Sequence, residues 1–154
     1  MVKGTRVWRV AGPIAGAALA LVALPACSRP PAPRPAATVE VTVKDFRIAA
    51  PPVVPPGLVS FDIQNRGPST HEFVVMRTDL ADGSLPLKPD GLTVEEDSPA
   101  LRLVGEDDDI DLGDTGVLLL RLAPGHYVFF CNLEGHYLGG MHASIEVGGD
   151  GYEG

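Results

Sequence analysis

Three side chains that bind soft metal ions stand in one short segment of the chain. Cys131, His136 and Met141 have the spacing Cys-x4-His-x4-Met, so one loop is able to wrap all three around a single ion. A thiolate, an imidazole and a thioether together suit copper better than they suit hard cations. Each residue taken alone has an ordinary alternative, as a buried thiol, a loop histidine or core filler. At this spacing the metal site is the better interpretation.

A second imidazole has to come from elsewhere, because the blue-copper arrangement is two histidines, a cysteine and a distant methionine. His71 is the best candidate, since it opens a predicted strand directly after the loop at 65–70. Its alternative is a surface position at a strand end. His126 lies beside a turn and His142 has outward parity, so both are predicted to be exposed. The expected site is one copper per chain, held by His71, Cys131, His136 and Met141.

The segments around these residues have the patterns of β-strands. Val39, Val41 and Val43 alternate with polar residues, which is the period of a half-buried strand. Residues 127–131 are apolar on both parities, so both faces of that strand are predicted to be buried. Short strands between Gly- and Pro-rich turns indicate an all-β sandwich. The other predicted strands are 58–64, 71–77, 117–122 and 142–147.

Most of the charge lies in one insertion, residues 78–114. The insertion holds 12 acidic and two basic residues, a net charge of −10. We expect a long surface excursion with a helical turn near 99–104. The acidic run at 106–111 lacks the glycine and the closing glutamate of an EF-hand loop, so solvated carboxylates are a better interpretation than a calcium site. A strongly acidic protein also excludes nucleic acid as an expected partner, because phosphate binding needs clustered Lys and Arg.

The first 27 residues have the order of an export signal. Basic residues within 3–9 precede an apolar run at 10–24, which is short for a membrane span and suited to a signal peptide. The run ends in Leu-Pro-Ala-Cys, which resembles a bacterial lipobox and predicts lipidation of Cys27. Plain cleavage near Ala26 remains the alternative. The predicted location is the extracytoplasmic face of a membrane, in the periplasm or at the cell surface.

The remaining chain divides into three parts. Residues 28–37 hold four prolines in ten positions and form an extended linker. Residues 38–148 form the domain, and 149–154 a C-terminal tail. Removal of 1–27 leaves Cys131 as the one cysteine, so no intramolecular disulfide is possible. A metal would hold this cysteine as a thiolate and protect it from oxidation.

Two segments resemble the cupredoxin family, which includes plastocyanin and azurin. Residues 124–131, Pro-Gly-His-Tyr-Val-Phe-Phe-Cys, and the loop that follows resemble the C-terminal signature of that family. Residues 65–73 resemble its first-histidine segment, and the loop lengths are similar to those of the rusticyanin and sulfocyanin branch. The resemblance covers about 38–148 and implies a Greek-key sandwich with copper at one end. Glu72 and Glu134 depart from the usual residues, and a carboxylate at 72 is able to lower the potential or compete as a ligand.

The resemblance implies a one-electron carrier with a redox protein as partner, and the acidic insertion favours a basic partner. The membrane surface is a second expected partner, through the lipid anchor. The alternative function is a copper carrier or buffer in a metal-handling system. Catalysis is not expected, because four histidines without a His-Cys-His cluster do not build a multicopper centre, and no Gly-x-Ser-x-Gly elbow is present. A binuclear copper site would need a second cysteine at position 135, which is glycine.

Overall fold

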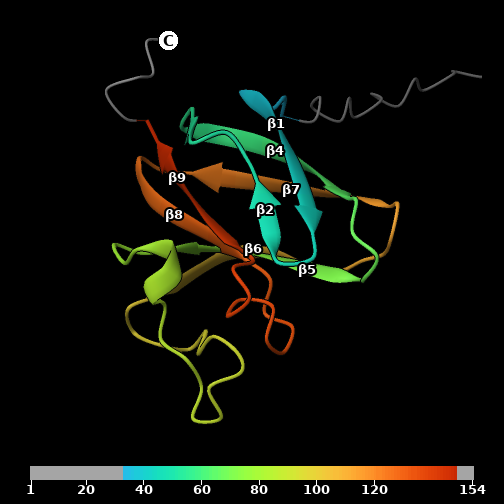
Figure 1. Ribbon diagram of the computed structural model, residues 1–154. Coiled ribbons are helices and arrows are strands. Elements are labelled where there is room, and N and C mark those ends of the chain that lie inside the picture. The colour runs from blue at the N-terminus through green and yellow to red at the C-terminus, as the bar shows by residue number, and fades with distance from the viewer. Residues whose placement is uncertain (1–32, 149–154) are drawn as a thin grey trace, which may run out of the picture. The chain divides into compact units, whose positions relative to one another are not determined.

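The computed structural model describes residues 33–148, which form two β-sheets packed face to face (Figure 1). One sheet has four strands in the order β2-β1-β4-β7, and the other has five in the order β3-β9-β8-β5-β6. Both sheets are mixed, because β1 pairs with β4 and β3 with β9 in parallel. The all-β sandwich expected from the sequence is confirmed. The strands are β1 Ala37–Lys44, β2 Arg47–Ala49, β3 Val53–Val54, β4 Gly57–Asn65, β5 His71–Arg77, β6 Arg102–Ile110, β7 Thr115–Leu122, β8 Gly125–Phe130 and β9 His142–Val147.

Alternation of apolar residues decides which strand faces meet. Val39, Val41 and Val43 of β1 are at most 5% exposed, whereas the residues between them face outward or stay half-exposed. Val59, Phe61 and Ile63 of β4 are fully buried beside them, because β1 and β4 pair in register. The core between the two sheets is built on this alternation.

A second core lies on the outer face of the five-stranded sheet. Strand β8 is buried on both faces, as its sequence predicts: Phe129 points into the sandwich, and Phe130 points into this second core. The insertion covers that outer face and contributes Leu85, Val94 and Leu101 to it. The insertion is therefore packed on the sheet instead of forming a free excursion.

The expected helical turn near 99–104 is wrong. Strand β6 begins at Arg102 and pairs antiparallel with β5, so this part of the insertion is the edge strand of the sheet. The helical segment that the described residues contain in the insertion is a 3-10 turn, η1, at Asp82–Ser84. The acidic side chains at 106, 108 and 109 are exposed along the edge strand. Charges at a sheet edge oppose pairing with another chain.

The expected signal peptide, the lipidation at Cys27 and the C-terminal tail lie outside the described residues, as does the first half of the linker. Within 33–148 no helix is long and apolar enough to cross a membrane.

Candidate metal centre

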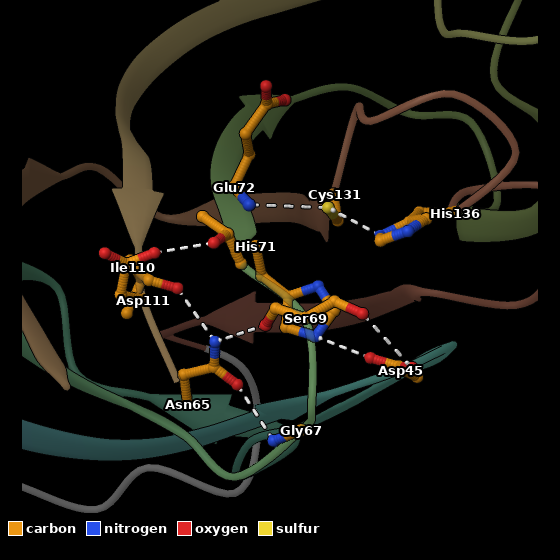
Figure 2. Close-up of polar contacts among 11 residues, drawn as sticks. Asp45, Asn65, Gly67, Ser69, His71, Glu72, Ile110, Asp111, Cys131 and His136 are labelled. Atoms are coloured by element: carbon orange, nitrogen blue, oxygen red, sulfur yellow. Dashed lines mark hydrogen bonds and ion pairs between the residues drawn. The ribbon is translucent and has the colours of Figure 1, made fainter. Parts of the chain in front are cut away.

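Three ligand-type side chains converge at one end of the sandwich, where β5 begins and β8 ends (Figure 2). A nitrogen of His71, the sulfur of Cys131 and a nitrogen of His136 lie within 4.8 Å of one another. His71 is the first residue of β5, Cys131 directly follows β8, and His136 lies in the loop between β8 and β9. The two imidazole rings meet edge to face, with centroids 5.3 Å apart. The structure therefore brings together three of the four residues expected from the sequence.

His71 is fully buried, and its ring has unmet bonding capacity. Nε2 lies 3.2 Å from a carboxylate oxygen of Asp45, but within residues 33–148 neither ring nitrogen has a partner at hydrogen-bonding geometry. Burial lowers the pKa of His71, the charge of His136 lowers it further, and Asp45 partly offsets both effects. A neutral imidazole with a free nitrogen is the form that binds a metal ion.

The position of His71 depends on the loop that precedes β5. The Asn65 side chain is buried and donates to the carbonyls of Ser69 and Ile110, each at 2.8 Å, while its oxygen accepts from the backbone N–H of Gly67 at 2.9 Å. A Cβ at Gly67 would lie 2.9 Å from Nε2 of His71, so only glycine permits this approach. Asn65 and Gly67 thus hold the loop against the ring (Figure 2).

Cys131 is fully buried between the two histidine-bearing segments. Its sulfur accepts the backbone N–H of Glu72 at 3.4 Å and lies 3.3 Å from Nδ1 of His136. Burial raises the pKa of the Cys131 thiol, and the backbone N–H groups of Leu133 and Glu72 offset part of that effect. A bound metal cation would instead lower the pKa of the Cys131 thiol, because the cation binds and stabilises the thiolate.

Glu72 contacts the cluster through its backbone N–H and not through its carboxylate. In Figure 2 the side chain points away from Cys131, and the metal-type cluster does not include it. Burial raises the pKa of Glu72, and the neighbouring charges of Asp108 and Glu96 raise it further. Competition of this carboxylate for the metal is therefore not supported by its orientation.

Met141 lies at the end of the same loop and is fully buried. The Cys131 N–H donates to the Met141 carbonyl at 3.1 Å, and the Met141 N–H donates to the His136 carbonyl at 3.0 Å. These bonds close the loop on itself, so the side chains of all three residues start from one rigid turn. Nothing in the geometry tests a bond between the Met141 sulfur and a metal, and its role stays a prediction.

His136 is the half-buried member of the cluster. The ring of Phe46 meets it edge to face at 5.6 Å, although Phe46 itself is 51% exposed. Phe46 fills the space above Gly139, and Leu138 beside the histidine is 53% exposed. The route from the cluster to solvent therefore passes through His136 and an apolar rim.

The insertion is bonded directly to the Cys131–Met141 loop. Asn132 accepts the N–H of Val94 at 2.6 Å and donates to the carbonyl of the same residue at 3.2 Å. The hydroxyl of Tyr137 accepts the N–H of Leu85 at 2.9 Å and donates to the Asp82 carbonyl at 2.7 Å. These contacts tie the Cys131–Met141 loop to the insertion.

The other two histidines lie outside the cluster but are not simple surface residues. His142 was expected to be exposed; instead its side chain is 23% exposed, its Nδ1 lies 3.2 Å from the Asp82 carboxylate, and its ring packs on Tyr137. The ring of His126 is half-buried, with Nδ1 2.8 Å from the carbonyl oxygen of Thr78. Strand parity alone misses these contacts because the insertion covers the outer face.

Several supporting residues were not found from the sequence. Asn65 had a detectable signal, since an asparagine before a Gly-Pro loop often bonds to the backbone of the turn. Asp45, Phe46, Asn132 and Tyr137 had none, because their partners are distant in the sequence.

No family model and no curated protein matches this chain. Among solved structures it is similar to auracyanin B, with a TM-score of 0.54, 25% identity and coverage of 76% of this chain and 92% of that one. It is also similar to auracyanin A, described as a "blue" copper protein from the green thermophilic photosynthetic bacterium Chloroflexus aurantiacus (TM-score 0.51, 16% identity, 72% and 98% covered). Rusticyanin from Thiobacillus ferrooxidans gives a TM-score of 0.52 at 17% identity, with 72% of this chain and 77% of that one covered.

Proposed function

We propose that this chain, a cupredoxin, binds one copper ion in a type 1 site and carries single electrons outside the cytoplasm. The observation that carries the proposal is the convergence of His71, Cys131 and His136 within 4.8 Å, together with the free ring nitrogens of the buried His71. A soft thiolate and two imidazoles are the donor set that copper prefers. The resemblance adds Met141 as the fourth residue that would hold the ion, and its burial on the same loop suits that role.

Bound copper would supply the one-electron couple, and the chain supplies rigidity and shielding. His71 is fixed by its loop and fully buried, and Cys131 is fixed by the Glu72 N–H and by the closed loop. Side chains held in this way change little when the charge of the site changes. Small rearrangement favours fast electron transfer.

Electrons would enter and leave through His136. It is the member of the cluster that reaches the surface, and Phe46 and Leu138 form an exposed apolar rim beside it. A partner able to bury this rim would bring its own cofactor close to the ring edge. The acidic insertion would favour a partner with a basic surface.

The location is part of the proposal. A lipid on Cys27 would tether the domain through the proline-rich linker to the extracytoplasmic face of a membrane. No catalytic role is proposed, because every chemical group of the cluster is accounted for as a metal ligand or as a support for one.

The deciding experiment measures copper retention through repeated reduction and reoxidation in the presence of a chelator for Cu(I). An electron carrier keeps one copper per chain and an intense thiolate-to-copper absorption band. Cys131→Ser should abolish that band, and His71→Gln should weaken copper binding strongly. His126→Gln is the matched control, because it removes an imidazole that lies outside the cluster.

Two results would contradict the proposal. A band that survives in Cys131→Ser would remove the copper assignment. Rapid loss of metal on reduction, with ready transfer to an acceptor protein, would favour the alternative function of a copper carrier or buffer.

A further inference from the structure

Three arginines line one groove at the end of the sandwich opposite the metal centre. Arg77 ends β5, Arg102 begins β6 and Arg121 lies near the end of β7; the groove between them has a volume of about 280 Å³. His71 begins the strand that Arg77 ends, and six residue-to-residue steps of extended chain separate them by about 20 Å. The groove is therefore separate from the proposed copper site.

The charge of these arginines is not balanced by the protein. No carboxylate lines the groove, and no Lys or Arg within residues 33–148 forms an ion pair. The described residues contain 18 acidic and 8 basic side chains, so carboxylates were available in number. Three of the eight bases therefore lie around one groove whose lining residues supply no counter-charge.

The strand register makes this grouping unfavourable for the protein alone. Arg77 and Arg102 are directly opposed partners in the β5–β6 pair. Like charges opposite each other on neighbouring strands destabilise a sheet. Arg121 approaches from the edge strand of the other sheet and, like Arg102, makes no side-chain hydrogen bond within 33–148. An anion bound in the groove would attract these arginines and offset the repulsion between them.

Arg77 is held in place, which favours a defined site. Its Nη2 donates to the Pro124 carbonyl at 3.0 Å, and its guanidinium lies over the Tyr127 ring, 5.9 Å from the centroid. These contacts use one N–H of the five that a guanidinium carries. The remaining N–H groups stay available to bind oxygen.

We propose that Arg77, Arg102 and Arg121 form a binding site for a phosphate-type oxyanion. One planar guanidinium can donate two parallel N–H···O hydrogen bonds to two oxygens of a phosphate group. Three guanidinium groups can therefore donate hydrogen bonds to a tetrahedral anion from several sides. The volume of the groove accommodates such an anion and leaves an open entrance for the group that carries it.

The chain itself indicates the source of the phosphate. The Ala36 N–H donates to the Leu58 carbonyl at 2.6 Å, and Leu58 is the strand partner of Arg121. The segment that leads to Cys27 therefore enters the domain at the arginine end. This step rests on the proposed lipid anchor: at a membrane surface, phospholipid headgroups would face this groove, and His136 would face away from the membrane.

The test compares two charge-matched double variants of the chain from residue 28 onward, which retains both cores. Arg102→Gln with Arg121→Gln removes two groove arginines. Arg34→Gln with Lys88→Gln is the control, because both side chains are exposed and neither lines the groove. One arm titrates inorganic phosphate by calorimetry; the other measures binding to vesicles of phosphatidylcholine with and without phosphatidylglycerol.

We expect the groove variant to bind phosphate about tenfold more weakly than the control, and to lose binding to the anionic vesicles. Equal affinities in the two variants would mean an adventitious ion only and would overturn the site. Phosphate binding without vesicle binding would contradict the assignment of a phospholipid headgroup and would identify free phosphate as the ligand. The copper absorption band is recorded in parallel and should be unchanged in both variants, so failure here is distinguishable from failure of the copper assignment.

Discussion

At the scale of single residues, the metal centre depends on side chains that touch the ligands rather than on the ligands alone. Asn65 makes three hydrogen bonds with buried or half-buried backbone, and all three hold the loop that presents His71. A buried polar group that loses its partner costs about 1–3 kcal/mol. The loop is thus stabilised before any metal binds, and the free nitrogens of His71 are kept in place for a ligand.

Asn65→Ala should lower the free energy of unfolding of the metal-free protein by about 3 kcal/mol, because it leaves the Ile110 and Ser69 carbonyls and the Gly67 N–H without partners. Denaturant unfolding measures this loss, and copper uptake by the variant should also be slower. Gln64→Ala is the control, since the hydrogen bonds of the Gln64 side chain within 33–148 go to the exposed side chains of Glu40 and Arg66. A similar loss in both variants would contradict the role of Asn65.

At the scale of elements, the strands that carry the site were predictable from short-range pattern. Residues 71–77 and 142–147 were predicted with the bounds that the structure shows, because apolar side chains there reveal buried faces. Strand β6 was missed because its acidic side chains hide the alternation of a half-buried strand. This edge strand is stabilised by its pairing with β5, and such pairing cannot be predicted from the local sequence pattern.

The same reasoning explains which parts of the site were found. The Cys131–Met141 segment contains three ligand-type residues at a recognisable spacing, so copper binding could be predicted from this short segment alone. The bonds from Asn132 to Val94 and from Tyr137 to Leu85 join segments 38 and 52 residues apart. Such contacts depend on how the insertion folds over the sheet, and folding of a long insertion is not determined by periodicity.

The insertion should act on copper through the loop that it contacts. Tyr137→Phe removes two hydrogen bonds between loop and insertion, and Asn132→Ala removes the bonds to Val94. Each change should cost about 1–2 kcal/mol of stability. We also expect a shifted reduction potential and several-fold faster loss of copper to a chelator.

Thr78→Val provides the matched comparison, because Thr78 bonds to Ala100 and Leu80 at the base of the insertion, away from the loop. It should cost similar stability and leave the potential unchanged. If all three variants shift the potential equally, the insertion does not position the loop.

The acidic edge strand should make stability depend on pH. Burial, Asp108 and Glu96 raise the pKa of Glu106 above its ordinary value. A raised carboxyl pKa means that the folded protein holds the proton more tightly than the unfolded chain, so this group opposes folding above its folded pKa and the penalty fades as pH falls through that value. Glu106→Gln should therefore stabilise the metal-free protein at pH 7 by at most about 0.5 kcal/mol, because the side chain is exposed and solvent screens it.

The measurement is the difference in melting temperature between Glu106→Gln and the unchanged protein across pH. The difference should shrink toward acid pH. A constant difference would show that packing, and not charge, separates the two proteins.

At the scale of the whole domain, β5 and β6 separate opposite charges. The acidic side chains of β6 lie toward Ile110, which pairs with His71 at the metal centre, whereas Arg102 pairs with Arg77 at the far end. The insertion also adds carboxylates beside the Cys131–Met141 loop, where Asn132 bonds to Glu96. An electrostatic field therefore runs along the sandwich, with its negative end at the proposed site of electron exchange. Such a field orients a charged partner before contact.

The bimolecular rate of electron transfer to a small basic redox protein should consequently fall about tenfold or more as ionic strength rises from low to physiological values. Neutralising the exposed pair Asp108 and Asp109 to asparagine should flatten this dependence, because these carboxylates lie near the metal end of β6. Glu40→Gln with Glu146→Gln removes the same charge from the exposed surface of β1 and β9, and should leave the salt dependence of the rate nearly unchanged.

Stopped-flow rates over a range of salt concentrations distinguish the two double variants. Equal slopes for both pairs would mean that net charge alone governs association, and a rate independent of salt would mean that the insertion serves solubility instead of steering.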